Sequence, residues 1–532
     1  MKIENTEMPD KKPHILLFNP DQMRADIMGH LGSGSTVTPF IDSLVENEAV
    51  SYANTCCQAP VCTPSRCSFA TGLYPHVNGH RSLHHMLHAE RGEKNMFQVL
   101  RENGYFVWWG GKNDIVTADA GPEAFCDIHF RPDDAFFERH HSRPRDDNHS
   151  AGESWRGKPC SDTFYSFFRG ELKKGNQDRY YLDSDWQNVL GAIEFIENAP
   201  TDRPLCIYLP ILYPHPPYGV ETEFFEASAN APLPPRRHAS EEQLSRKPDM
   251  LRQIRKAQRL EGWTEERWDA LRRTYLGMVA RVDRQFELLM AALKRAGIYD
   301  DTAVFMFSDH GDYTGDYEVV EKSQTTMEDP IVRVPLVVKP PKQIPVTPGV
   351  RDHVMAELID MTATVFDLAN ADPGYDHFGR TLTPSLADPA IPHRQYAFCE
   401  GGRRPDEMQV SEQESLLQFG SDPTEGLYFP RINIQVNDAR AHARTVMIRS
   451  LTHKYIRRMS GEDEFYDLRA DPMELANRID DPALATELAR HKDALLGWYL
   501  ETSDIVPRKT DSRWKTKIDE RSPAAKATGL ES

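Results

Sequence analysis

Short runs of consecutive apolar residues recur along the chain and predict buried strands. The clearest runs are His14–Phe18, Tyr105–Trp109, Leu205–Leu209 and Ala303–Phe307. Runs of this length that are apolar on both faces are typical of parallel strands with helices on each side of the sheet. We therefore expect these four segments to lie together in one sheet.

Helical spacing of apolar residues occurs between these runs. From Leu271 to Leu293 apolar side chains recur at steps of three and four residues, and Gly297 follows as a C-terminal cap. A second pattern of this kind runs from Trp186 to Ile196. Alternating strands and helices predict an α/β fold, with a large, mainly parallel sheet sandwiched by helices.

The pattern changes after residue 390. Short alternating strands such as Thr445–Arg449 and His453–Arg457 follow, and a helix is expected over about 483–500. These changes divide the chain into a larger α/β domain over residues 13–390, a smaller C-terminal α+β domain over 391–505 and a tail over 506–532.

Two stretches of the larger domain show little periodicity. Residues 117–183 and 214–262 are rich in polar residues and proline. Long irregular segments of this kind usually carry function, so we expect both to form loops over a binding site and to influence its selectivity.

Composition excludes several classes of protein. The 532 residues include 63 Lys and Arg against 81 Asp and Glu, a net charge of −18 that disfavours binding to nucleic acid. No apolar run approaches the roughly 20 residues of a membrane span. The first twelve residues lack the apolar stretch of a secretory signal, so we expect a cytoplasmic protein.

Polar side chains follow each of the four predicted strands. In open α/β sheets, ligands bind at the carboxyl ends of the strands, so we expect these groups to share one site. In chain order they are Asp21 and Gln22, Lys112, His215, and Asp309 and His310.

The segment Cys62-Thr-Pro-Ser-Arg66 predicts the start of a helix. Thr63 is the expected N-cap, Pro64 fits the first helical position and Gly72 the left-handed stop. Cys62 would then lie just ahead of a helix N-terminus, which favours an anion, and Arg66 adds a positive charge. Both an anion-binding nucleophile site and an ordinary capped helix fit this pattern.

Cys62–Arg66 followed by Thr-Gly-Leu-Tyr-Pro75 resembles the signature of the type I, formylglycine-dependent sulfatases of the alkaline phosphatase superfamily. The resemblance covers roughly residues 13–500. Other matches in the family's order are Asp21-Gln22, Gly111-Lys112, His215, Asp309-His310, Lys322, Arg333-Val-Pro335 and Phe465-Tyr-Asp-Leu-Arg-Ala-Asp-Pro472.

This resemblance implies a sulfatase that hydrolyses a sulfate monoester to an alcohol and sulfate. In the family a separate maturation enzyme oxidises the motif cysteine, here Cys62, to Cα-formylglycine, which hydrates to a geminal diol. One hydroxyl attacks sulfur and expels the alcohol. Deprotonation of the second hydroxyl then releases sulfate and restores the aldehyde.

The resemblance also implies one divalent metal ion, held by the side chain at position 62 and by four further ligands. Oxygen-rich ligation favours Ca²⁺ or Mg²⁺, and one imidazole admits Mn²⁺; we take Ca²⁺ as the first expectation. The four ligands resemble the choline-sulfatase and phosphonate monoester hydrolase branches. They are Asp21, Gln22, Asp309 and His310.

By the same resemblance, Arg66, Lys112, His215 and Lys322 belong to the catalytic site. Lys112, His215 and Lys322 would surround the sulfuryl oxygens, with His215 and Lys322 as candidates to protonate the leaving alcohol. The two lysines would stabilise charge on those oxygens.

The chain departs from the family pattern after the second strand. The family commonly has Gly-Lys-x-His, whereas this chain reads Gly111-Lys112-Asn113-Asp114. We hypothesise that Asp114, or His84 or His85 nearby, is the base for the elimination step. Asp114 as a supporting or substrate-facing carboxylate fits equally well.

Three alternative functions stay open. The same site could hydrolyse phosphonate monoesters or phosphodiesters, although Lys112 speaks against this because the phosphonate hydrolases place neutral groups there. A silent binding protein would keep Cys62 unmodified. A cysteine hydrolase using Cys62 and His215 would leave the metal ligands unexplained. The identity of the sulfated alcohol and whether the chain forms a homo-oligomer are not encoded in these motifs.

Overall fold

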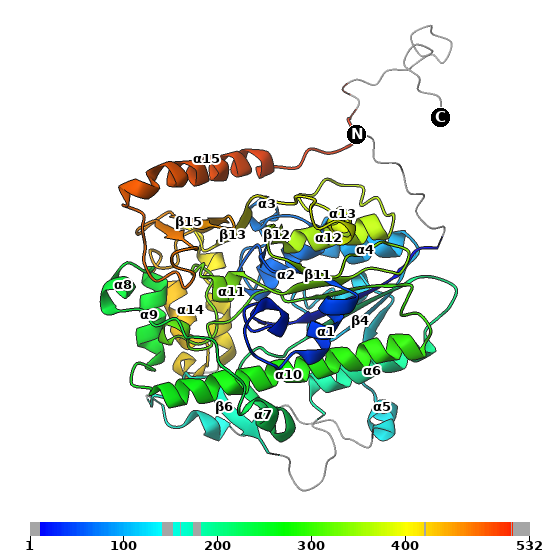
Figure 1. The fold of residues 1–532 in the computed structure, drawn as a ribbon, viewed down its shortest axis with the longest axis horizontal. Coiled ribbons are helices and arrows are strands. Elements are labelled where there is room, and N and C mark those ends of the chain that lie inside the picture. The colour runs from blue at the N-terminus through cyan, green and yellow to red at the C-terminus, as the bar shows by residue number, and fades with distance from the viewer. Residues whose placement is uncertain are drawn as a thin grey trace.

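A large sheet with helices on both faces forms the centre of the computed structural model, which describes residues 11–140, 153–159, 161–173, 182–419, 422–511 and 513 (Figure 1). Its strands, in order across the sheet, are β11 (Gly349–Arg351), β2 (Val50–Tyr52), β10 (Leu336–Lys339), β9 (Thr302–Phe307), β1 (His14–Pro20), β7 (Leu205–Ile211), β4 (Phe106–Gly110) and β5 (Ile128–Phe130).

The predicted parallel core of the sheet is confirmed. β1 lies between β7 and β9 and is parallel to both, β4 is parallel to β7, and β5 is parallel to β4. β10 is antiparallel to β9 and β2 and separates this core from the β2–β11 edge. All four apolar runs are strands here, so their carboxyl ends lie on one edge of the sheet.

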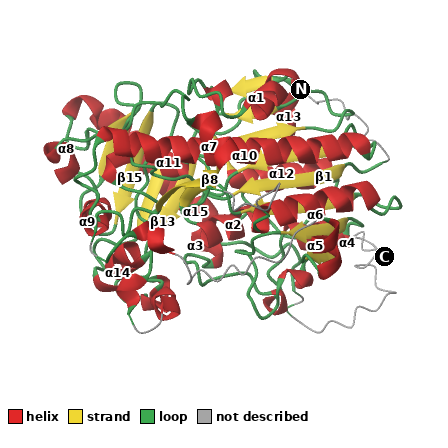
Figure 2. Ribbon diagram, turned by 90° about the horizontal axis from the view of Figure 1, so that it is seen from below, coloured by secondary structure: helices red, strands yellow, loops and turns green. Residues whose placement is uncertain are grey.

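Two helical layers cover the sheet, as Figures 1 and 2 show. Successive residues of β1 alternate between the layers: Ile15 and Leu17 pack into one core, Leu16 and Phe18 into the other. The first layer contains α2 (Cys62–Thr71), α4 (Met96–Glu102) and α12 (Leu358–Leu368), and the second contains α1 (Pro39–Asn47), α6 (Ser184–Asn198), α7 (Thr222–Ser228) and α10 (Glu265–Arg295).

Both helices predicted from periodicity are present as α6 and α10. Gly297 follows α10 with φ +71°, the left-handed conformation expected of a residue that ends a helix. The prediction of loops over 117–183 and 214–262 is partly wrong. The described part of the first segment contains β5, α5 (Asp134–Arg139) and β6 (Phe168–Leu172). The second segment contains β8 (Tyr218–Glu221), α7, α8 (Glu241–Ser245) and α9 (Asp249–Gln258).

A small antiparallel sheet follows, as predicted for the C-terminal region. Its strands, in order, are β13 (Ala397–Gly401), β14 (Thr445–Arg449), β15 (His453–Arg458) and β16 (Glu464–Asp467). α15 (Ala485–Thr502) packs on it through Leu495 and Trp498. A long connection between β13 and β14 contains α14 (Phe429–Asn437).

Buried ion pairs join the two sheets. The Asp329 carboxylate, in α11 (Asp329–Val332), lies 2.9 Å from an Arg449 guanidinium nitrogen and 2.6 Å from Lys454 Nζ. The proposed domain boundary at residue 390 stays a prediction. Among the described residues, the α-helices and strands not yet named are α3 (Pro75–Asn78), α13 (Thr383–Ala387), β3 (Thr55–Cys56) and β12 (Ala356–Glu357).

Parts of two predicted segments lie outside the described residues. These parts are 141–152, 160 and 174–181 of the predicted insertion, and 512 and 514–532 of the predicted tail. Within the part of the chain that the structure describes, no helix has both the length and the apolar character that a membrane span needs.

Candidate active site and metal centre

The side chains that follow β1, β4, β7 and β9 meet at the carboxyl edge of the sheet, as the strand pattern predicted. Asp21 follows β1, Lys112 follows β4, His215 follows β7 and Asp309 follows β9. The contacts below join them into one buried cluster with the start of α2. They are separated by up to 288 positions in sequence, so only the fold brings them together.

Cys62 is the first residue of α2. The preceding Val61 is the N-cap, and its carbonyl accepts a hydrogen bond from Ser65 N at 3.2 Å. The prediction that Thr63 caps the helix is therefore wrong, and its hydroxyl donates instead to the Leu83 carbonyl. The C-terminal stop at Gly72 is confirmed by its φ of +74°. Cys62 thus lies within the first turn of the helix, where backbone N–H groups are free of helical partners.

Arg66 ties the two candidate metal carboxylates together. Its Nη2 donates to Asp21 Oδ2 at 2.9 Å and its Nε to Asp309 Oδ2 at 2.8 Å, and all three side chains are fully buried. Although burial opposes ionisation, Lys112 and Arg66 hold the pKa of Asp21 well below its usual range. Both carboxylates are thus oriented by one guanidinium.

His310 turns its Nε2 toward Cys62. Its Nδ1 lies 3.0 Å from the Gly311 carbonyl oxygen, which can only accept, so Nδ1 carries the proton and Nε2 keeps its lone pair. Nε2 lies 3.2 Å from Cys62 Sγ and 3.6 Å from Asp21 Oδ1. One potential ligand atom from each of Asp21, Cys62, Asp309 and His310 lies within 4.8 Å of the others. Two carboxylates and one bare imidazole nitrogen fit a divalent cation.

Gln22, the fifth predicted ligand, lies beside this group with a left-handed backbone, φ +65°. Its Oε1 accepts a hydrogen bond from Lys322 Nζ at 2.7 Å, and its Nε2 donates to Asp312 at 2.5 Å. Its backbone N–H donates to Asp309 Oδ1. The structure thus places Gln22 between the metal-ligand candidates and Lys322, and its role as a ligand stays a prediction.

Lys322 and His215 form a hydrogen-bonded pair. His215 Nδ1 donates to the Pro216 carbonyl at 2.6 Å, so its Nε2 accepts from Lys322 Nζ at 3.0 Å. Burial, with Lys322 next in effect, lowers the pKa of His215 well below its usual range. Burial opposes the charge of Lys322, but Cys62 and Glu321 raise its pKa. The proton of this pair therefore resides on Lys322.

Lys112 bridges Asp21 and Asp114. Its Nζ lies 2.6 Å from Asp21 Oδ2, 2.8 Å from Asp114 Oδ2 and 3.8 Å from Cys62 Sγ. Asp114 is also 3.9 Å from Arg66 Nε. Lys112 therefore reaches the cluster as predicted, and Asp114 stands at its outer side.

The two histidines proposed beside Asp114 have other contacts. His84 Nε2 lies 2.8 Å from the Ser415 hydroxyl, on the β13–β14 connection. Burial lowers the pKa of His85, with His80 and Arg81 next in effect. Among the described residues neither ring lies within hydrogen-bonding or ion-pair distance of Lys112 or Arg66, whereas Asp114 lies close to both, so Asp114 is the better placed of the three.

Burial raises the pKa of the Cys62 thiol to about 12, and Asp21 adds to the effect. An unmodified thiol at this position is protonated at neutral pH and is a weak nucleophile. Its histidine neighbour is His310, not His215. Both observations disfavour a cysteine hydrolase built on Cys62 and His215.

Sequence reasoning missed several residues that support the site. Asp312 accepts from Gln22, from the Tyr218 hydroxyl at 2.7 Å and from Thr314. The run Asp309-His310-Gly311-Asp312 held a signal for Asp312, because this carboxylate also follows a strand. Tyr218 lies 94 positions away and had no such signal.

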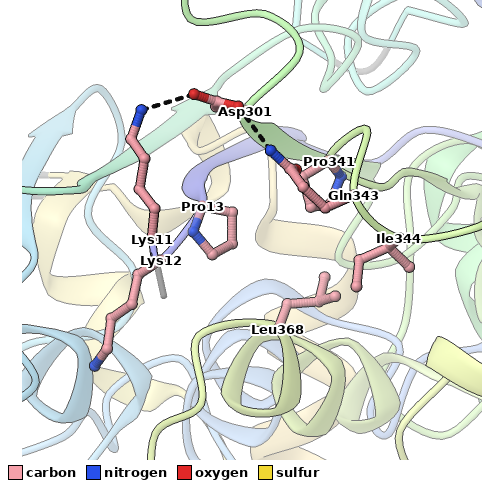
Figure 3. Close-up of a pocket in the computed structure, with 8 residues that line it drawn as sticks. All are labelled: Lys11, Lys12, Pro13, Asp301, Pro341, Gln343, Ile344 and Leu368. Carbon is pink, nitrogen blue, oxygen red and sulfur yellow. Dashed lines mark hydrogen bonds and ion pairs between the residues drawn. The ribbon is translucent and has the colours of Figure 1, made fainter. Parts of the chain in front are cut away.

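Figure 3 shows the residues that line a separate pocket, which lies at the opposite edge of the sheet from the candidate active site. Pro13 and Asp301, which line it, directly precede β1 and β9. Lys11 and Gln343 both donate to the Asp301 carboxylate. None of the predicted site residues lines this pocket, so it is distinct from the candidate active site.

Comparisons with known proteins agree with this geometry. The chain is 24% identical over 531 residues to the multifunctional alkaline phosphatase superfamily protein PehA of Trinickia caryophylli, covering 93% of this chain and 96% of that protein. It is 23% identical over 528 residues to the choline-sulfatase of Rhizobium meliloti, covering 95% and 91%. The crystal structure of the phosphonate monoester hydrolase of Agrobacterium radiobacter matches with a TM-score of 0.70 and 21% identity, covering 94% of this chain and 100% of that one.

The fold and the similarities define an enzyme of the alkaline phosphatase superfamily. A model of the Sulfatase family matches residues 13–371, more than half of the chain. The chain therefore belongs to the sulfatase family and is a sulfuric ester hydrolase.

Proposed function

We propose that this protein hydrolyses a sulfate monoester to an alcohol and inorganic sulfate, using one divalent metal ion and a formylglycine formed from Cys62 by a separate maturation enzyme. The observation that carries the proposal is the position of Cys62. It lies at a helix N-terminus, beside two carboxylates and a bare imidazole nitrogen, with Lys112 3.8 Å away.

The metal ion would be held by Asp21, Asp309, His310 and the side chain at position 62, with Gln22 as a further ligand. A divalent ion at such a position stabilises charge on the transferring group and acidifies a hydroxyl. Arg66 would keep the outer oxygens of both carboxylates occupied, so that Asp21 Oδ1 stays directed at the cluster. The oxygen-rich ligands favour Ca²⁺, with Mg²⁺ and Mn²⁺ as alternatives.

Formylglycine at position 62 supplies, as its hydrate, a hydroxyl nucleophile and a second hydroxyl whose deprotonation allows sulfate to leave. The chain's own residues would bind and orient the sulfuryl group. Lys112 and Lys322 provide two fixed positive charges for its oxygens, a preorganised arrangement that needs no rearrangement as negative charge develops.

Lys322 and His215 would deliver the proton to the leaving alcohol. The proton resides on Lys322, and the neutral His215 accepts a hydrogen bond from it. His215 thus holds the Lys322 ammonium in place and can relay its proton. Asp114, 2.8 Å from Lys112 Nζ, is the proposed base for the elimination step.

Phosphonate monoester or phosphodiester hydrolysis at the same site is the second candidate. The phosphonate monoester hydrolase of Agrobacterium radiobacter, with its TM-score of 0.70, supports it. Lys112 supports the sulfatase instead, because a cation paired with Asp21 replaces the neutral groups expected in a phosphonate hydrolase.

Two measurements test the proposal. In protein from a host with a maturation enzyme, the mass of the tryptic peptide Ala25–Arg66 should show conversion of one cysteine to formylglycine, and fragmentation should place it at Cys62. Metal-replete protein should release sulfate from 4-nitrophenyl sulfate with a higher kcat/KM than it shows on phenyl phenylphosphonate. An intact Cys62 thiol, or a reversed preference, would contradict the proposal.

A further inference from the structure

The described part of the connection between β13 and β14, residues 402–419 and 422–444, contacts the candidate active site through Tyr428 and Arg431. The Tyr165 hydroxyl donates to the Thr424 carbonyl at 2.7 Å, and Arg156 Nη1 donates to the Glu425 carbonyl at 2.6 Å. Both partners belong to the insertion after β5. Two segments that carry none of the candidate metal ligands therefore meet here.

Buried ion pairs fix the start of α14 against the loop that carries Lys322. Arg431 Nη1 lies 2.7 Å from Glu412 Oε2, and Arg431 Nε lies 3.3 Å from Glu321 Oε2. Glu321 Oε1 lies 3.4 Å from Lys322 Nζ. All four side chains are at most 5% exposed. A chain of alternating charges therefore runs from α14 to the proposed proton donor.

Tyr428, the residue before α14, lies beside His215, the hydrogen-bond partner of Lys322. Its ring centroid lies 5.2 Å from that of Phe167 and 6.4 Å from that of His215. Burial raises the pKa of Tyr428, and Lys322 and Lys112 are among the charges that act on its hydroxyl. Within the described ranges this hydroxyl has no hydrogen-bond partner. The ring thus lies next to His215, and its hydroxyl is close enough to Lys322 and Lys112 to feel their charges.

We propose that the ring of Tyr428 is the surface against which the alcohol part of the substrate packs, and that it makes the site selective for esters of ring-shaped, apolar alcohols. The inference rests on the proposed function. If Lys322 and His215 protonate the leaving oxygen, the group attached to that oxygen lies near them, and the ring of Tyr428 lies beside both His215 and Phe167. Planar rings stack well on such a face.

The test compares phenyl sulfate with ethyl sulfate on the full-length, metal-replete enzyme. Tyr428→Leu should lower kcat/KM for phenyl sulfate about 5- to 10-fold, the value of a lost aromatic contact, and leave ethyl sulfate within about 2-fold. Tyr428→Phe should keep both values within about 2-fold, because it keeps the ring. Where turnover of ethyl sulfate is too slow to measure, its inhibition constant against phenyl sulfate replaces it.

Tyr396→Leu is the matched control. Tyr396 is a half-buried tyrosine that packs on His491 with centroids 5.4 Å apart, in the small sheet region, and its loss should change neither substrate. Equal losses on both substrates in Tyr428→Leu, or a Tyr428→Phe enzyme that behaves like the leucine variant, would overturn the inference. A wild-type enzyme that releases no sulfate from any ester would instead overturn the proposed function, and the inference with it.

Discussion

Replacing Arg66 by methionine should destabilise the metal-free protein strongly. The change keeps most of the side-chain length but removes the guanidinium that bridges Asp21 and Asp309. Asp21 keeps Lys112 as a partner at 2.6 Å. Among the described residues, the donors that remain to Asp309 are the backbone N–H groups of Gln22 and His310, at 3.1 and 3.0 Å. Most of the destabilisation should therefore come from the Asp309 carboxylate, which loses its charged partner.

The free energy of unfolding should fall by about 3–5 kcal/mol, the cost of breaking a buried ion pair, because one charge stays buried without its partner. A divalent ion at the proposed site neutralises the same two carboxylates, so Ca²⁺ should restore part of the loss. Urea unfolding followed by fluorescence, in chelator and in excess Ca²⁺, measures both quantities.

Arg508→Met is the control for losing an arginine with two acidic partners. Arg508 pairs with Asp372 and Asp376 at the surface, where such pairs contribute little. Its unfolding midpoint should match the wild type. An Arg66→Met midpoint in chelator that also matches the wild type would refute the idea that Arg66 balances buried charge at this site.

Three further predictions concern catalysis and pH. Asp114→Asn should lower kcat at least about 100-fold, the usual contribution of a general base, with little change in KM, and unchanged turnover would remove Asp114 from that role. Dialysis against a chelator should abolish sulfate release, and Ca²⁺ should restore it; full activity in the chelated protein would contradict the metal site. Burial, with Arg403 and Arg431 next in effect, lowers the pKa of His442 to about 3. Between about pH 6.5 and 3, His442 therefore binds a proton in the unfolded chain but not in the folded chain. The free energy of unfolding should consequently decrease as the pH is lowered from about 6.5 to 3. His442→Gln should make this fall shallower by up to about 1.4 kcal/mol per pH unit, and parallel curves would show that His442 does not contribute.

The strands and the strand-end residues could be predicted from sequence because each signal is local. An apolar run such as His14–Phe18 can only be buried, and the side chain after it must then lie at a sheet edge. The helix cap at Thr63 was mispredicted because the backbone turn begins at Val61, and the Thr63 hydroxyl finds a carbonyl at Leu83 instead.

The missed elements depended on contacts between distant segments. α9 carries only a short apolar face, Met250, Leu251 and Ile254, inside a segment dominated by charged and polar residues. Tyr428 approaches His215 across more than two hundred positions. The segment after it alternates Ile432, Ile434 and Val436 with polar residues, which is a strand pattern, yet it folds as α14. No local pattern encodes such an approach.

The buried ion pairs between the two sheets determine how far this protein can be shortened. The family match ends at residue 371, but Asp329 is neutralised by Arg449 and Lys454, which lie beyond it. A fragment cut after the match would keep Arg333, 3.9 Å from Asp329, but would lose Arg449 and Lys454, the two nearer cations. Lys322 would lose the support that reaches it through Glu321 from Arg431. The part of the chain that the family model matches therefore depends on the C-terminal region, which neutralises Asp329 and supports Lys322.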